Sequence, residues 1–203
     1  MTNYFKQTEA QIMPVLKQHN KIGIMLSGGL DSGTLSWCIF KLIADNNLDK
    51  DVTVYTVART DNSLTHANKI RTILEQYFDI EIKHKIRGSK AVHHSQQVNS
   101  GVISAMKDND IVFTAETRKP DHMQTEHFER IRWDGGGSGF SQPWFDLTKD
   151  VIVATAIECG LTDIMKYSHT CTQTPMIRCR ECWWCGERAW AFSENNYTDP
   201  GRY

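Results

Sequence analysis

The sequence predicts an α/β fold, a parallel sheet with helices on both faces, followed by a small C-terminal segment built around four cysteines. Three observations lead to this prediction. Short apolar runs alternate with stretches of helical period, a glycine-rich turn follows the first apolar run, and four of the six cysteines lie after residue 170. Strands that alternate with helices are typical of parallel sheets, because each connection between parallel strands crosses back over the sheet.

The first part of the chain predicts a helix, a strand and a second helix. Residues 4–19 have the period of a helix, although Pro14 lies within them. Residues 22–26 form a short apolar run that ends in Ser-Gly-Gly, which indicates a buried strand. Residues 32–45 carry apolar side chains at the spacing of one helix face, namely Leu35, Cys38, Ile39, Leu42 and Ile43.

The same alternation continues along the rest of the chain. We expect further strands at 52–57, 80–86 and 110–115, and further helices at 63–78, 95–107 and 148–159. Gly160 follows the last helix as a C-terminal cap. Together these elements predict a Rossmann-like sheet within residues 1–165. A ligand of such a sheet binds beyond the carboxyl ends of the strands, where the strand order reverses.

Composition favours a small-molecule enzyme of the cytoplasm. The net charge is −1 and the pI is about 6.7, so the chain lacks the basic character of a nucleic-acid-binding protein. No stretch approaches the roughly 20 apolar residues of a membrane helix, and the first residues are polar rather than signal-like. We therefore expect a cytoplasmic protein with no membrane or nucleic-acid partner.

The glycine-rich turn carries the strongest functional signal. It joins an apolar strand to an amphipathic helix and reads Ser27, Gly28, Gly29, Leu30, Asp31 and Ser32. Glycines let backbone amides approach a ligand, and a helix N-terminus attracts anions. These properties predict a pyrophosphate site in which Asp31 holds Mg²⁺ or orients the loop. The alternative is a tight turn that is glycine-rich by chance.

The turn lacks the Gly-Lys-Ser/Thr ending of a Walker A loop. It resembles instead the SGGxDS signature of the ATP-pyrophosphatase-loop (PP-loop) superfamily. The resemblance implies an enzyme that splits ATP between the α and β phosphates and transfers AMP to a substrate oxygen. It also implies that Val57, after the second strand, contacts adenine through its backbone. Ordinary strand residues at this position are equally compatible with the sequence.

The four clustered cysteines predict a metal site in a C-terminal segment, residues 166–203. Their spacing brings four thiolates to one ion, which suits a closed, structural Zn²⁺ site. An iron–sulfur cluster and a set of reduced thiols are the alternatives. The predicted ligands are Cys171, Cys179, Cys182 and Cys185.

The two ends of the chain together resemble the 7-cyano-7-deazaguanine synthase (QueC) family. Beside the glycine-rich turn, the resemblance rests on the Cys-x2-Cys-x2-Cys-x2-Arg tail that ends at Arg188, on Thr170-Cys171, and on Pro143 with Leu147-Thr148-Lys149. The resemblance implies ATP, Mg²⁺ and Zn²⁺ as ligands and a homodimer. We assign Lys149 to stabilising charge on the phosphate oxygens; a solvated lysine is the alternative.

The resemblance implies an ATP-dependent ligase. The substrate would be 7-carboxy-7-deazaguanine, which is adenylated and condensed with ammonia to an amide and then, after a second adenylation, to a nitrile. Two alternatives keep the same ATP chemistry: a variant that stops at the amide, and a tRNA sulfur transferase. A third is a binding protein with an inactive loop, which the intact SGGxDS sequence disfavours.

Overall fold

The computed structural model describes residues 3–59, 62–88, 94–123, 139–174 and 176–201. Its centre is a five-stranded parallel sheet with the order β3-β2-β1-β4-β5. The strands are β1 (Lys21–Met25), β2 (Asp51–Val57), β3 (Lys83–Arg87), β4 (Ile111–Phe113) and β5 (Phe140–Ser141). The chain builds outward from β1 to β3 and then returns to the other side of β1. The switch point therefore lies between β1 and β4.

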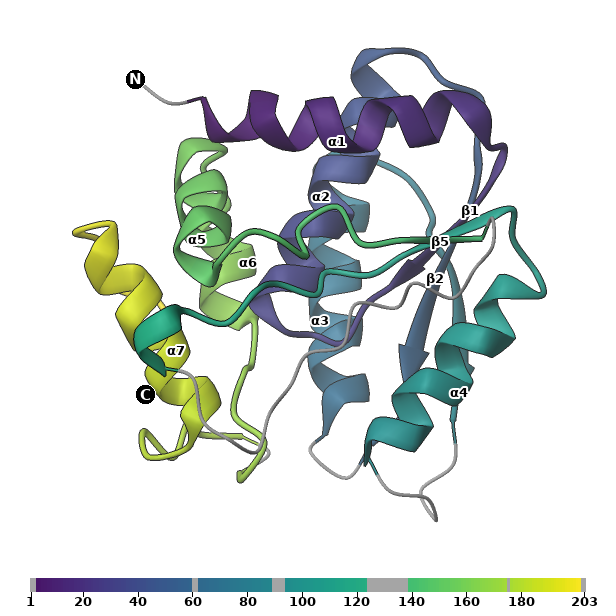
Figure 1. The fold of residues 1–203 in the computed structure, drawn as a ribbon. Coiled ribbons are helices and arrows are strands. Elements are labelled where there is room, and N and C mark those ends of the chain that lie inside the picture. Colours follow the sequence, from purple (N-terminus) through teal and green to yellow (C-terminus); the bar gives the residue numbers. More distant parts are fainter. Residues whose placement is uncertain (1–2, 60–61, 89–93, 124–138, 175, 202–203) are drawn as a thin grey trace.

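Helices cover both faces of the sheet, as the sequence predicts (Figure 1). Most of them pack into one core, and among the described helices α4 alone covers the opposite face. The larger group contains α1 (Tyr4–Gln18), α2 (Leu30–Asp45), α3 (Ser63–Phe78), α5 (Lys149–Glu158), α6 (Thr162–Tyr167) and α7 (Trp183–Glu194), and α4 spans His94–Met106. A short 3₁₀ turn, η1, spans Asp121–Met123.

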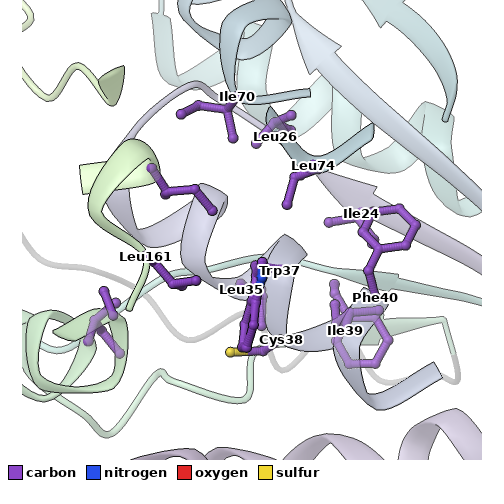
Figure 2. Packing of buried hydrophobic residues seen from close by; sticks show 14 of the residues in the cluster. Ile24, Leu26, Leu35, Trp37, Cys38, Ile39, Phe40, Ile70, Leu74 and Leu161 are labelled. Atoms are coloured by element: carbon purple, nitrogen blue, oxygen red, sulfur yellow. The ribbon is translucent and has the colours of Figure 1, made fainter. Parts of the chain in front are cut away.

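Alternating side chains of the strands divide between two hydrophobic cores. Ile22 and Ile24 of β1 point to the large core, in which α2 and α3 pack together (Figure 2). Met25 and Tyr55 belong to the smaller core beneath α4. Burial on both faces is typical of a parallel sheet and explains why β1 and β2 are mostly apolar. The rigid framework holds the loops at the carboxyl ends of β1 and β4 beside each other.

The α/β architecture predicted from the sequence is confirmed, with differences at element ends. The third strand starts at Lys83 rather than at residue 80. Asp79 adopts a left-handed conformation (φ 53°) and Ile80 N donates to Glu75 O, so these residues terminate α3. The fourth strand starts one residue late, because the carboxylate of Asp110 accepts hydrogen bonds from the N–H groups of Asn20 and Lys21.

Several elements were not predicted. These are β5, α6 and α7. The domain boundary predicted after residue 165 falls inside α6, and the division at that point stays a prediction. No helix in the described ranges is long and apolar enough to cross a membrane.

Candidate functional site

The glycine loop (residues 27–32) connects β1 to α2 at the switch point. Its hydroxyls hold the loop in shape: Ser27 Oγ accepts from Gly29 N at 3.3 Å and lies 3.0 Å from Ser32 Oγ, which donates to Gly29 O. Gly29 is the N-cap of α2 and provides no side-chain cap. The first N–H groups of α2 consequently have no partner inside the helix, which is the arrangement that binds anions.

Gly28 brings the loop close to its neighbours. It has φ 80°, and a Cβ at this position would lie 2.5 Å from Ala67 N in α3. On the other side its carbonyl accepts a hydrogen bond from His169 N at 2.9 Å. The His169 ring stacks on the ring of His66, with centroids 4.3 Å apart. Only glycine fits at Gly28, and the loop is fixed between α3 and the segment that follows α6.

Asp31 and Lys149, the two predicted catalytic residues, lie together. Lys149 Nζ donates to Asp31 Oδ2 at 2.5 Å, and Glu187 Oε2 lies 3.3 Å from the same nitrogen. The Lys149 side chain is only 2% exposed, which excludes a solvated lysine. Asp31 Oδ1 is buried and has no hydrogen-bond partner among the described residues. The second carboxylate oxygen is therefore available to a cation.

Val57, the predicted adenine contact, ends β2 next to the site. Its side chain is buried and fills the space over two glycines: a Cβ on Gly88 or on Gly101 would lie 2.8 or 2.4 Å from a Val57 methyl group. Its carbonyl accepts a hydrogen bond from Ser63 Oγ at 2.9 Å. The side chain thus packs in the core, and an adenine contact through the backbone stays a prediction.

Two connections from the other side of the switch point complete the site. Residues 114–123, after β4, and residues 142–148, after β5, run side by side; the first segment ends beside α7 and the second leads into α5 (Figure 1). Arg118 N donates to Leu147 O, and Gln142 Nε2 donates to Glu116 Oε2 at 2.7 Å. Lys119 is buried, and its ammonium lies 5.7 Å from the centroid of the Trp183 ring. Polar side chains thus line the side of the switch point opposite the glycine loop.

The structure brings together all four predicted metal ligands. The sulfur atoms of Cys171, Cys179, Cys182 and Cys185 all lie within 4.8 Å of one another, and two of the pairs are 4.0 Å apart. Four sulfurs at about 2.3 Å from a single tetrahedral ion lie roughly 3.8 Å apart. The observed spacing fits a single ion with small inward shifts of the side chains.

The pKa values of the cysteine thiols depend on burial and on hydrogen bonds, both in the cluster and outside it. For Cys171, burial raises the pKa, but hydrogen bonds from Thr174 and from backbone amides outweigh it and lower the pKa to about 6. Burial raises the pKa of Cys185 to about 12. Away from the cluster, burial raises the pKa of Cys159 to about 11 and that of Cys38 well above its usual value. These last two thiols stay protonated at neutral pH.

A buried ion-pair network fastens the C-terminal segment to the α/β domain. Arg188, 1% exposed, forms two hydrogen bonds with the Asp199 carboxylate at 2.7 and 2.8 Å. It also donates to Met165 O and Ser168 Oγ at the end of α6. Arg178 pairs with the same carboxylate. The arginine predicted as part of the cysteine tail is therefore a structural residue.

Sequence reasoning missed two residues of the site. Glu187 lies on α7, and its side chain is fully buried beside Lys149. A signal was available: Glu187 adjoins the stripe Arg188, Ala191 and Phe192, which is spaced as one buried helix face, and a charge there indicates a buried ion pair. His169 has no comparable signal, because its contact with the glycine loop is made by its backbone.

Comparisons with protein-family models and with curated protein sequences gave no match. The fold is similar to that of NMN synthetase from Francisella tularensis, with a TM-score of 0.56 and 11% identity over 98% of this chain and 88% of that chain. It is also similar to the U34-tRNA thiolase NcsA from Methanococcus maripaludis with its [4Fe-4S] cluster, with a TM-score of 0.50 and 10% identity over 95% of this chain and 71% of that chain. Both are members of the PP-loop ATP pyrophosphatase family, and this chain shares their fold.

Proposed function

We propose that this chain is an ATP-dependent carbon–nitrogen ligase resembling 7-cyano-7-deazaguanine synthase. The observation that carries the proposal is the glycine loop at the N-terminus of α2, which has no side-chain cap. Asp31 of this loop forms an ion pair with the buried Lys149. The shared PP-loop fold and the four-cysteine cluster at the other end of the chain support it.

The residues present fit a bound nucleotide and its cation. The left-handed conformation of Gly28 and the free N–H groups of α2 form a site for the β and γ phosphates. Asp31 Oδ1, buried without a hydrogen-bond partner among the described residues, would hold a Mg²⁺ ion. Mg²⁺ supplies charge neutralisation at the phosphates.

The cysteine cluster fits zinc in a structural role. Four sulfurs leave no open coordination position for a substrate, and the spacing near 4.0 Å matches one ion. A cluster of several irons would need room for additional atoms between the sulfurs. Zinc would fix the N-terminal end of α7, which starts immediately after Cys182.

The proposed reaction uses two adenylations, first of the carboxylate and then of the amide. An oxygen of 7-carboxy-7-deazaguanine attacks the α phosphorus of ATP, and pyrophosphate leaves from the glycine loop. Ammonia then displaces AMP from the acyl adenylate, which gives the amide. The amide oxygen attacks the α phosphorus of a second ATP, and pyrophosphate and a proton from the amide nitrogen are released. Loss of AMP and the second nitrogen-bound proton from that adenylate gives the nitrile. The protein contributes positioning and charge stabilisation to each step.

Lys149 stabilises the negative charge that grows on the phosphate oxygens during each transfer. Asp31 and Glu187 lie against its ammonium, which is buried at the N-terminus of α5, where the helix dipole disfavours a cation. Burial and the helix dipole both make a lysine unfavourable at this position, and its presence there indicates a role at the site rather than in the fold.

A tRNA sulfur transferase is the second candidate, which the likeness to the tRNA thiolase favours. Such an enzyme needs a thiolate to carry sulfur near the nucleotide. Cys38 lies in α2, but it is completely buried and its pKa is raised by that burial. The near-neutral net charge likewise provides no broad basic surface for RNA. We therefore rank thiolation below ligation, and a variant that stops at the amide between them.

The test is incubation of the purified protein with ATP, Mg²⁺, ammonium and 7-carboxy-7-deazaguanine, with products identified by mass spectrometry. The proposal expects AMP, pyrophosphate and the nitrile, with the amide as an intermediate. Amide without nitrile would identify the variant that stops early. Absence of AMP and of both products would contradict the ligase assignment, and thiolation of a tRNA by the same protein would establish the second candidate.

The remaining partners follow from the same proposal. The substrates are small molecules, and we propose a cytoplasmic homodimer that binds neither membrane nor nucleic acid. Light scattering of the purified protein measures the mass of the assembly, and a mass near the 23.3 kDa of one chain would contradict the dimer.

A further inference from the structure

We propose that Glu187 is a positioning residue that holds Lys149 against the glycine loop. This inference rests on the proposed function, because it assigns to Lys149 a role toward the phosphates. It concerns a residue outside the loop, from a helix that belongs to the C-terminal segment.

Three helices meet at the Lys149 ammonium. Asp31 comes from the first turn of α2, Lys149 from the first turn of α5, and Glu187 from α7. The lysine side chain is 2% exposed and the glutamate side chain 0%. A carboxylate that is fully buried is costly unless it is paired, so the pairing with Lys149 explains why a glutamate is present at this position.

The two carboxylates, of Asp31 and of Glu187, have different roles. Asp31 lies in the glycine loop, and its second oxygen, Oδ1, faces no hydrogen-bond donor in the described structure. Glu187 is 3.3 Å from the ammonium and lies outside the loop. Without the charge of Glu187, less negative charge would offset the burial of Lys149 and its unfavourable position at a helix N-terminus. The lysine side chain would then move away from the loop, or its ammonium would pair with both oxygens of Asp31 and displace the Mg²⁺ proposed at Oδ1.

The position of Glu187 is set by the cysteine cluster. Two of the cluster cysteines, Cys182 and Cys185, flank the first turn of α7, and Glu187 follows the second of them by two residues. Rotation or displacement of this turn would move the carboxylate away from Lys149. Through Glu187, the C-terminal segment contacts the lysine of the proposed nucleotide site, which gives the segment a role in binding as well as in stability.

The test is a double-mutant cycle of Glu187→Gln and Lys149→Met, read as the Kd for ATP·Mg²⁺ by isothermal titration calorimetry. Glu187→Gln removes the negative charge that lies 3.3 Å from the Lys149 ammonium, and we expect it to weaken binding by roughly tenfold. In the Lys149→Met background the same change should alter the Kd less than about twofold, because no lysine is left to position. Glu194→Gln, at the exposed end of α7, is the matched control and should bind ATP like the wild type.

Thermal unfolding without nucleotide supplies a second reading of the same cycle. Glu187→Gln should lower the Tm of the wild type and raise the Tm of Lys149→Met, in which the buried carboxylate has lost its lysine. ATP binding by Glu187→Gln that is as tight as in the wild type, or tighter, would overturn the positioning role. If Glu187 does not position Lys149, its removal only reduces the repulsion between a carboxylate and the phosphates, and binding should not weaken. Equal weakening in both backgrounds would also overturn it. If the wild type itself binds no ATP, the proposed function fails, and the thermal cycle still shows whether the pair exists.

Discussion

Substitution of Gly28 by alanine tests the glycine loop at its most constrained point. Gly28 has φ 80°, and an added Cβ would lie 2.5 Å from the backbone nitrogen of Ala67 and equally close to His66 Cβ. The left-handed conformation costs a non-glycine residue about 1–3 kcal/mol. The contact adds to this cost, because a backbone atom of α3 cannot move aside like the end of a flexible side chain.

The loop relieves this strain most readily by shifting, and the phosphate site is lost with that shift. A penalty of about 1–3 kcal/mol corresponds to roughly 5- to 150-fold in affinity, so we expect Gly28→Ala to weaken ATP·Mg²⁺ binding by at least about tenfold. Isothermal titration calorimetry gives the Kd, and circular dichroism verifies that the variant is folded.

Gly160→Ala is the matched control for Gly28→Ala. Gly160 also has a positive φ, 66°, but a Cβ there would meet no atom within 4 Å. This variant carries the conformational cost of about 1–2 kcal/mol without the clash, at the end of α5. It should lose stability and keep the wild-type Kd. A folded Gly28→Ala protein that binds ATP as tightly as Gly160→Ala would refute the assignment of the loop.

Three further predictions concern the C-terminal segment. Cys171→Ser should reduce the metal content from about one ion per chain, measured by inductively coupled plasma mass spectrometry, whereas Cys159→Ser should retain it; equal metal in both variants would exclude the cluster. Arg188→Met should destabilise the protein by about 3–5 kcal/mol in guanidinium unfolding, because it removes one partner of a buried carboxylate; a change below about 1 kcal/mol would contradict the network described here. Burial raises the pKa of Asp199, but its two arginines, Arg188 and Arg178, outweigh burial and lower the pKa below 3.8. Its contribution to stability is thus complete above pH 3.8 and is lost as the pH falls through the lowered pKa. Asp199→Asn should reduce the dependence of Tm on pH in that acidic range, and an unchanged slope would contradict the assignment.

The parts of the fold that follow from local pattern were predictable from the sequence. Helix α3 spans residues 63–78 as predicted, because its apolar positions repeat with helical period. The strands β1 and β2 were found because apolar runs bounded by polar residues are typical of buried parallel strands. The glycine loop was found because its six residues match a known signature of residue types at fixed spacing.

The parts that depend on tertiary packing could not be predicted. The two residues of β5 are too few to carry a pattern. Helix α7 was missed because clustered cysteines and bulky tryptophans dominate its first turn and hide the helical period. The site contact of Glu187 exists only because α7 packs against α5, and its sequence distance from Lys149 gives no indication of that contact.

The central claim is that the loop around Gly28 binds the phosphates of ATP. The most direct measurement is a crystal structure with α,β-methylene-ATP, which cannot be split between the α and β phosphates, together with Mg²⁺. We expect the phosphate oxygens within hydrogen-bond distance of the N–H groups of residues 28–32, and the cation at Asp31 Oδ1. A nucleotide bound elsewhere, with the loop unchanged and empty, would contradict the account.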